Sequence, residues 1–210
     1  MKLYGEHGWG SALIEAQLEW YGIDYEFKAV GDLFKSADAR DKLAESNPIS
    51  QVPTLVMDDG SIMTESAAIT LLLAEQQNDE SLVPASGSPE RAAFLRWLIF
   101  IVANVYPTYT YADDPSRFVA AEDARKDYEN TVRAWGERMY SVLEDNAGQP
   151  WFLGDRFSAI DIYLCLMTRW EPGRKWFEEH APKLLTIAIA AEQVDELKET
   201  WTRNFRVSQI

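Results

Sequence analysis

The stretch Asn47-Pro48-Ile49-Ser50-Gln51-Val52-Pro53-Thr54-Leu55, with Met63-Thr64-Glu65-Ser66-Ala67-Ala68-Ile69 just downstream, decides how this chain folds. The apolar run Pro53-Thr54-Leu55-Val56-Met57 predicts a strand, and Asp58-Asp59-Gly60-Ser61 is typical of a hairpin turn into a second short strand at Ile62-Met63. Residues 65–76 then carry apolar side chains at helical spacing. The stretch therefore predicts a hairpin that leads directly into a helix.

Upstream of this hairpin, the chain alternates strands and helices. Lys2-Leu3-Tyr4 predicts a strand, and a glycine-rich turn follows over residues 5–10. A helix is expected from Ser11 until Gly22 ends it, and alternating apolar residues over 25–29 predict the next strand. A weaker helix is expected over residues 36–45. The strand-helix-strand order predicts a parallel crossover connection, and the first third of the chain reads β-α-β-α-β-β-α.

Downstream, residues 78–88 are polar and rich in turn residues, which predicts a linker, and no convincing strand follows. Ser88-Pro89-Glu90 is a typical helix start, and that helix should run to about Val105, where Pro107 interferes. Further helices are expected over residues 120–146, 158–170, 175–180, 183–192 and 195–205. The second part of the chain is therefore predicted to be all helical.

Composition excludes several classes of function. The 210 residues are 47% hydrophobic and carry a net charge of −14 without a basic stripe, which argues against nucleic acids and anionic membranes as partners. One cysteine, Cys165, and two histidines exclude an intrachain disulfide and give no basis for a zinc site, so no metal is expected. No signal peptide and no run of ~18 apolar residues is found, so we expect a cytoplasmic protein.

Two motifs together resemble those of cytosolic glutathione transferases, in particular bacterial, serine-type members. The first is the opening stretch, and the second is Phe157-Ser158-Ala159-Ile160-Asp161, which is similar to the capping box of that family's helical domain. The resemblance covers essentially the whole chain. It implies an α+β thioredoxin-like, glutathione-binding domain (residues 1–77), a linker (78–88) and an all-α helical-bundle domain (89–210). It also implies a homodimer, with contacts near residues 65–76 and 90–105.

The resemblance also implies where glutathione binds. In the family, the proline that matches Pro53 is cis, so that Val52 offers a free backbone N–H and C=O to the cysteinyl segment of glutathione. Glu65 and Ser66, at a helix start, suit the ammonium and carboxylate of the γ-glutamyl group, and Gln51 could hold the glycyl carboxylate. The alternatives are that Pro53 is an ordinary trans proline at a strand start, that Glu65 and Ser66 only cap the helix, and that Gln51 is a solvated surface side chain.

Members of the family activate the glutathione thiol with a tyrosine, serine or cysteine near the first strand-helix turn. Here the turn contains no tyrosine or cysteine, and Ser11 is the remaining hydroxyl, unless it only caps the helix. A pocket for the second substrate is predicted between the domains, lined by aromatic side chains. The alternative is that these aromatic side chains only pack in the core. The candidates are Trp9, Tyr106, Tyr109 and Trp170.

These residues predict a glutathione transferase that uses glutathione as a co-substrate and attacks a small apolar electrophile. Two alternatives stay open: a glutathione transferase-like binding module without turnover, and a glutathione-dependent peroxidase, isomerase or dehalogenase on the same fold. The Ser158–Asp161 box is expected to be structural, and Cys165, within an apolar run, an inert core residue.

Overall fold

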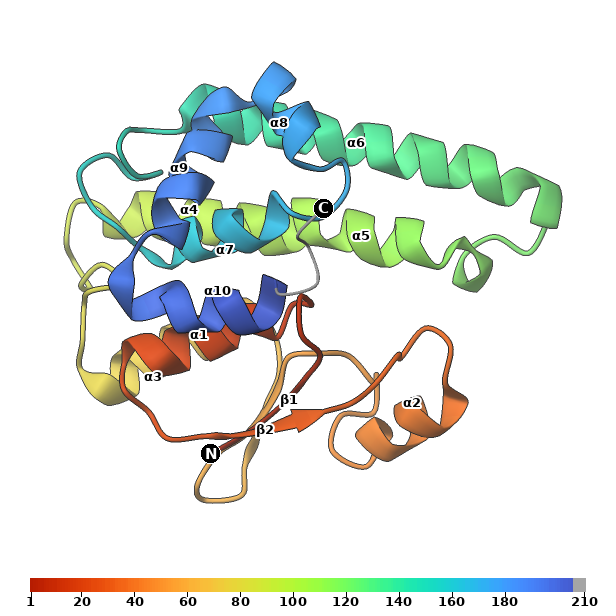
Figure 1. The fold of residues 1–210 in the computed structure, drawn as a ribbon, viewed down its shortest axis with the longest axis horizontal. Coiled ribbons are helices and arrows are strands. Elements are labelled where there is room, and N and C mark those ends of the chain that lie inside the picture. Colours follow the sequence, from red (N-terminus) through yellow and green to blue (C-terminus); the bar gives the residue numbers. More distant parts are fainter. Residues whose placement is uncertain (206–210) are drawn as a thin grey trace. The chain divides into compact units, whose positions relative to one another are not determined.

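The structure, a computed structural model, describes residues 1–205, which pack as two units (Figure 1). The first unit combines both ends of the chain, Met1–Val83 and Ile189–Ile210, and the second unit is Pro84–Ala188. The break between the units falls inside the linker predicted over residues 78–88. The sequence assigned all residues from 89 onward to one helical domain, whereas in the structure the chain returns to the first unit at Ile189.

The first unit is built on a four-stranded mixed sheet in the order β2-β1-β3-β4. Strand β1 pairs in parallel with β2 and antiparallel with β3, and β3 pairs antiparallel with β4. The parallel pair is the crossover that the sequence predicts. The strands are β1 (Lys2–Gly5), β2 (Glu26–Ala29), β3 (Thr54–Val56) and β4 (Ile62–Met63).

The helices of this first part of the chain also follow the prediction. They are α1 (Ala12–Trp20), α2 (Ala37–Ala44) and α3 (Ser66–Gln77). Leu3 of β1, Leu55 of β3 and one face of α1 and α3 form a buried core, in which Ile14 and Ile69 are fully buried. Seven side chains make up this core, Leu3, Ile14, Leu18, Leu55, Met57, Ile69 and Leu73.

The end of the chain completes the first unit. A 3-10 turn (Asp195–Leu197) leads into α10 (Lys198–Phe205), which lies beside α1 in Figure 1. Trp201 of α10 is buried, and Arg203 forms an ion pair with Glu15 of α1. A helix that the sequence assigned to the second domain therefore belongs to the packing of the first.

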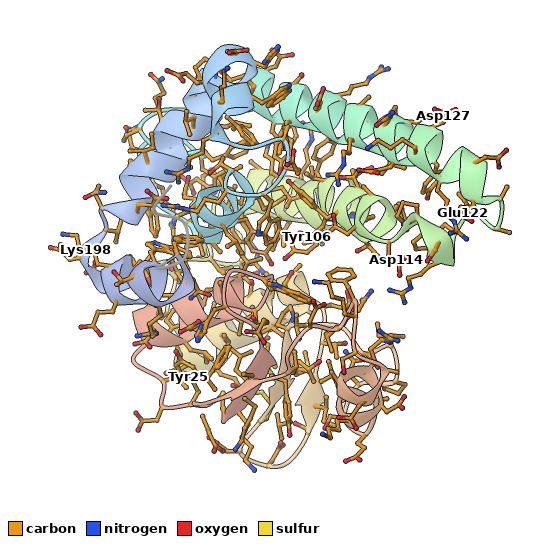
Figure 2. All side chains as sticks on the ribbon, turned by 45° about the vertical axis from the view of Figure 1, so that its right-hand side comes forward. Tyr25, Tyr106, Asp114, Glu122, Asp127 and Lys198 are labelled. Carbon is orange, nitrogen blue, oxygen red and sulfur yellow. The ribbon has the colours of Figure 1, made fainter. Side chains whose placement is uncertain are left out.

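The second unit is all helical, as predicted. Its helices are α4 (Arg91–Phe100), α5 (Tyr106–Asp113), α6 (Arg125–Asn146), α7 (Ala159–Met167) and α8 (Arg174–His180), and α9 (Pro182–Glu192) ends across the boundary. Two 3-10 turns, Pro115–Arg117 and Glu122–Ala124, precede α6. At this α5–α6 end Figure 2 shows the acidic side chains of Asp114, Glu122 and Asp127.

Pro107 does not end its helix, in contrast to the prediction. A π-helical segment, η1 (Ile101–Val105), joins α4 to α5, and Pro107 occupies the first turn of α5. Proline has no N–H to donate, and a wider turn accommodates that loss without breaking the helix. The Asn104 side-chain amide donates to the Phe100 carbonyl, 3.2 Å away, within this segment.

The continuous helix Arg91–Asp113 is, by length and composition, apolar enough to cross a membrane, and it is the one such helix among residues 1–205. Only 33% of its most apolar window is buried, and Ile99 is 49% exposed. Core helices of soluble proteins pass the same test of length and composition. The exposed apolar face is nevertheless a feature that a partner could cover.

The capping box at the start of α7 forms as predicted. The backbone N–H groups of Ser158 and Phe152 each donate to the Asp161 carboxylate over 2.8 Å. Burial raises the pKa of Asp161 to about 7, although these hydrogen bonds favour the ionised form. Cys165, four residues further along α7, is fully buried, which fits the expected core residue.

Candidate functional site

The loop before β3 presents an unused segment of backbone. The Val52–Pro53 peptide bond is cis, and Val52 is half-buried. Within residues 1–205 no hydrogen bond uses the backbone N–H or C=O of Val52. These two groups are therefore free to pair with an extended peptide as an additional strand.

Asn47 and Thr54, which belong to the opening motif but received no role of their own from the sequence, hold this loop. The Asn47 amide donates to the Gln51 carbonyl and to the Thr54 hydroxyl, 3.0 Å each, and the Thr54 hydroxyl donates to Gln51 over 2.8 Å. Both residues are buried. The Gln51 side chain is exposed, whereas the Gln51 backbone carbonyl accepts the two hydrogen bonds from Asn47 and Thr54.

The start of α3 is an unusual helix terminus. Glu65, its N-cap residue, has φ 63° and ψ 102°, and its side chain caps no N–H group. A non-glycine residue in this region costs about 1–3 kcal/mol, and such strain is concentrated at ligand sites. The Glu65 carboxylate is exposed and makes no hydrogen bond or ion pair with residues 1–205.

The next residues of α3 offer hydrogen-bond donors. The hydroxyl of Ser66 has no partner among residues 1–205, and the same holds for the first backbone N–H groups, those of Ser66, Ala67 and Ala68. A helix N-terminus with free N–H groups attracts an anion, because the helix dipole adds to the hydrogen bonds. Glu65 and Ser66 thus place a free carboxylate next to a free anion-binding terminus.

The turn between β1 and α1 is fixed by Ser11. Ser11 is 0% exposed, and its hydroxyl donates to the Glu6 carbonyl and accepts from the Glu6 N–H, both over 3.0 Å. A Cβ on Gly5 would come within 2.3 Å of the Ser11 side chain, so this contact requires glycine. The Ser11 side chain caps no N–H of α1. The predicted thiol activator therefore has its hydroxyl engaged with the backbone of Glu6.

Two backbone donors lie at the same helix start. The N–H groups of Gly10 and Ser11 have no hydrogen-bond acceptor within residues 1–205, although both residues are buried. Buried N–H groups normally have a partner, so a ligand atom at this position would satisfy them. Glu6 anchors the other end of the turn, because its carboxylate accepts from the Gly31 N–H over 2.9 Å.

The aromatic residues of this turn pack on neighbours from the first unit. His7 is exposed and stacks on Phe27, with ring centroids 4.7 Å apart. Trp9 is half-buried and contacts Phe34, 5.1 Å between centroids. Arg40 donates to the Leu33 and Phe34 carbonyls, so that its guanidinium fixes the neighbouring loop.

In the second unit, the structure brings three predicted pocket residues together. The rings of Tyr106, Tyr109 and Trp170 meet edge to face, with centroid distances of 5.0 to 6.3 Å. The Tyr109 hydroxyl is 2.5 Å from that of Tyr140. The fourth candidate, Trp9, belongs to the first unit.

Tyr106, labelled in Figure 2, differs from its neighbours because its hydroxyl is buried and has no hydrogen-bond partner in the described chain. Burial, and secondarily the nearby Tyr163 and Tyr109, raises the pKa of Tyr106 well above its usual value. The hydroxyl therefore keeps its proton and is available as a donor. No cluster of three or more metal-ligating side chains occurs in residues 1–205.

Known proteins resemble the whole chain. The family model for the N-terminal domain of glutathione S-transferase matches residues 11–81. The uncharacterized GST-like protein YncG of Escherichia coli (strain K12) is 38% identical over 205 residues, 97% of this chain and 98% of that protein. Glutathione S-transferase GstA of Escherichia coli O157:H7 is 31% identical over 171 residues, 81% of this chain and 82% of that protein. A sphingomonad glutathione S-transferase, solved in complex with glutathione, shares 26% identity and a TM-score of 0.73 over 95% of this chain and 96% of its own.

Proposed function

Since the chain belongs to the glutathione S-transferase family, we propose that it binds glutathione on the first unit and uses its thiol to attack an apolar electrophile. The observation that carries this proposal is the free polar groups at two neighbouring motifs, the backbone of Val52 and the start of α3 at Glu65 and Ser66. The sphingomonad relative was solved with glutathione bound, which supports the same ligand here.

Each part of glutathione has a chemically matched group. The Glu65 carboxylate pairs with the γ-glutamyl ammonium, and the Ser66 hydroxyl with the first N–H groups of α3 binds the γ-glutamyl carboxylate. The N–H and C=O of Val52, next to Pro53, pair with the backbone of the cysteinyl residue. Gln51, whose side chain is exposed, donates to the glycyl carboxylate. The net charge of −14 makes such local donors necessary for an anionic ligand.

Thiol activation is assigned to the start of α1. A free thiol of this kind has a pKa of ~8.5, and donors that stabilise the thiolate lower it. The sequence proposes the Ser11 hydroxyl for this role, and that assignment stays a prediction. The engagement of this hydroxyl by Glu6 favours the alternative, in which the N–H groups of Gly10 and Ser11 donate to the sulfur.

The second substrate is assigned to the aromatic cluster of Tyr106, Tyr109 and Trp170, and Trp9 as a further wall stays a prediction of the sequence. The thiolate electron pair forms the new carbon–sulfur bond, and the displaced pair moves to a leaving group or to a conjugated oxygen. The protonated Tyr106 hydroxyl can donate to such an oxygen. This favours apolar electrophiles that carry a hydrogen-bond acceptor, as expected of a detoxifying transferase.

A homodimer in the cytoplasm is part of the same proposal. Ile99 and the exposed Ala92, Ala93 and Ala103 give the helix Arg91–Asp113 an apolar face that a second copy would cover. The family resemblance adds a contact near residues 65–76. Light scattering at micromolar concentration should give twice the mass of the 23.9 kDa chain, and a monomer mass would exclude this assembly.

Titration of glutathione into the purified protein by calorimetry tests binding, and the ultraviolet absorbance of the thiolate against pH tests activation. We expect binding and a thiol pKa below the free value of ~8.5. A panel of electrophiles and hydroperoxides then separates transferase from peroxidase or isomerase chemistry. Binding without a lowered thiol pKa and without turnover would indicate a binding module. Absence of glutathione binding would exclude both the transferase and the binding module.

A further inference from the structure

Asn204, on α10 at the other end of the sequence, contacts the turn that precedes α1. Its side-chain oxygen accepts a 2.9 Å hydrogen bond from the N–H of Gly8, 196 positions away. Asn204 is 6% exposed, and a Cβ on Gly8 would come within 3.4 Å of the Asn204 carbonyl oxygen. The last helix therefore packs closely against the segment between β1 and α1.

The orientation of the Asn204 amide is set by a buried carboxylate. The Asn204 NH2 group donates to Glu15 Oε2 over 2.8 Å and to the Thr200 carbonyl over 2.9 Å. An ionised carboxylate only accepts hydrogen bonds, so the NH2 group must face Glu15. The oxygen of the amide then faces Gly8, whose N–H can only donate. Both neighbours thus specify the same rotamer.

Glu15 itself is held firmly. Its side chain is 2% exposed, and Arg203 Nε donates to Oε1 over 2.8 Å. The same guanidinium donates to Glu19 over 2.6 Å, and the Tyr25 hydroxyl donates to Glu19 over 2.9 Å. A buried carboxylate with this set of donors has a fixed position on α1. Through Asn204 it also fixes Gly8, two residues before the unpaired N–H of Gly10.

We propose that Asn204, oriented by Glu15, is a positioning residue that holds the β1–α1 turn so that the Gly10 and Ser11 N–H groups face the glutathione sulfur. This inference rests on the proposed function. Asn204 acts through Gly8 and needs no contact with glutathione. The γ-glutamyl and cysteinyl groups are assigned to residues 51–66, so Asn204 governs thiol activation rather than affinity.

The test compares Asn204→Leu with Trp201→Phe, a change on the same helix that leaves Glu15 and Asn204 with their partners, in the full-length protein. Asn204→Leu keeps the branched shape of the side chain but removes its hydrogen bonds to Gly8, Glu15 and Thr200, whereas Trp201→Phe reduces the buried packing of α10 and leaves these bonds in place. We expect Asn204→Leu to raise the pKa of bound glutathione by about one unit and to lower kcat about tenfold, with the glutathione dissociation constant changed less than threefold. Trp201→Phe should lower the melting temperature, because it leaves a smaller side chain in a buried position, and should leave the thiol pKa unchanged.

Hydrogen exchange of the ligand-free proteins supplies an independent readout. The Gly8 amide should exchange at least tenfold faster in Asn204→Leu than in wild type, because its acceptor is gone. An unchanged thiol pKa in Asn204→Leu, or equal shifts in both variants, would overturn the positioning role and leave α10 as a general support. If wild-type protein binds glutathione without lowering its thiol pKa, the proposed function fails, whereas the exchange of Gly8 still reports on the hydrogen bond.

Discussion

Replacing Glu65 separates the conformation of the α3 start from its chemistry. Glu65 has a positive φ of 63°, and its carboxylate has no partner in the described chain. In the ligand-free protein the side chain thus contributes strain without a compensating contact. Glu65→Gly removes the strain, and Glu65→Gln keeps the backbone and the shape but removes the charge.

The expected magnitudes follow from these observations. A strained non-glycine residue costs about 1–3 kcal/mol, and the lower end of this range corresponds to a rise of about 2–4 °C in melting temperature for a chain of this size. Glu65→Gly should therefore melt higher than wild type, and Glu65→Gln at the same temperature. A hydrogen bond to a charged group is worth about 1.5–3 kcal/mol, so both variants should bind glutathione at least tenfold more weakly.

Calorimetry with a modified ligand identifies the partner of Glu65. An analogue of glutathione that lacks the γ-glutamyl amino group should bind wild type and Glu65→Gln with nearly equal affinity, because the interaction is already absent. Thermal unfolding of the ligand-free proteins, followed by circular dichroism, measures the expected changes in melting temperature. A Glu65→Gly variant that melts lower, or glutathione affinity unchanged in Glu65→Gln, would refute the reasoning.

Three further perturbations have defined outcomes. Ser11→Ala removes two part-buried hydrogen bonds to Glu6, worth ~2 kcal/mol, and should lower the ligand-free melting temperature by roughly 4–8 °C. An unchanged melting temperature together with a raised thiol pKa would show that the Ser11 hydroxyl donates to the glutathione sulfur instead. Tyr106→Phe removes a buried hydroxyl that has no hydrogen-bond partner, so it should raise the melting temperature while slowing turnover of electrophiles that carry a hydrogen-bond acceptor. The control Tyr109→Phe loses the hydrogen bond to Tyr140 and should have a lower melting temperature. The folded pKa of Asp161, about 7, lies above its unfolded value of ~3.9, so its stabilising contribution is largest at low pH and is lost as the pH rises toward 7. The melting temperature of wild type relative to Asp161→Asn should accordingly fall between pH 5 and pH 8, and a flat difference over this range would show that the hydrogen bonds keep the carboxylate ionised.

Local sequence patterns predicted the parts of the fold that depend on neighbours in sequence. The hairpin after Pro53 and the capping box of Ser158 and Asp161 are each set by turn and cap residues within a few positions. The resemblance added the cis bond before Pro53. Such features follow from backbone preferences, and tertiary packing has little freedom to change them.

Features that depend on tertiary contacts were not predictable in this way. Ser11 was identified as a hydroxyl at a helix start, but its partner, the backbone of Glu6, is determined by the path of the turn. Pro107 carries a helix-breaking signal, yet the π-helical segment Ile101–Val105 accommodates it. Asn204 has no local signal at all, because its partner Gly8 is 196 positions away.

The first unit contains the first and the last residues of the described chain, and this order matters during synthesis. A ribosome would release Glu15 long before Arg203 and Asn204 exist to pair with its carboxylate, which is 2% exposed in the finished fold. A nascent or recombinant fragment that stops at Val83 would leave this charge without its two partners from α10. Expression of the first unit alone should therefore require α10 to be joined back to residues 1–83, because Glu15 would otherwise be a buried charge without its ion-pair partner.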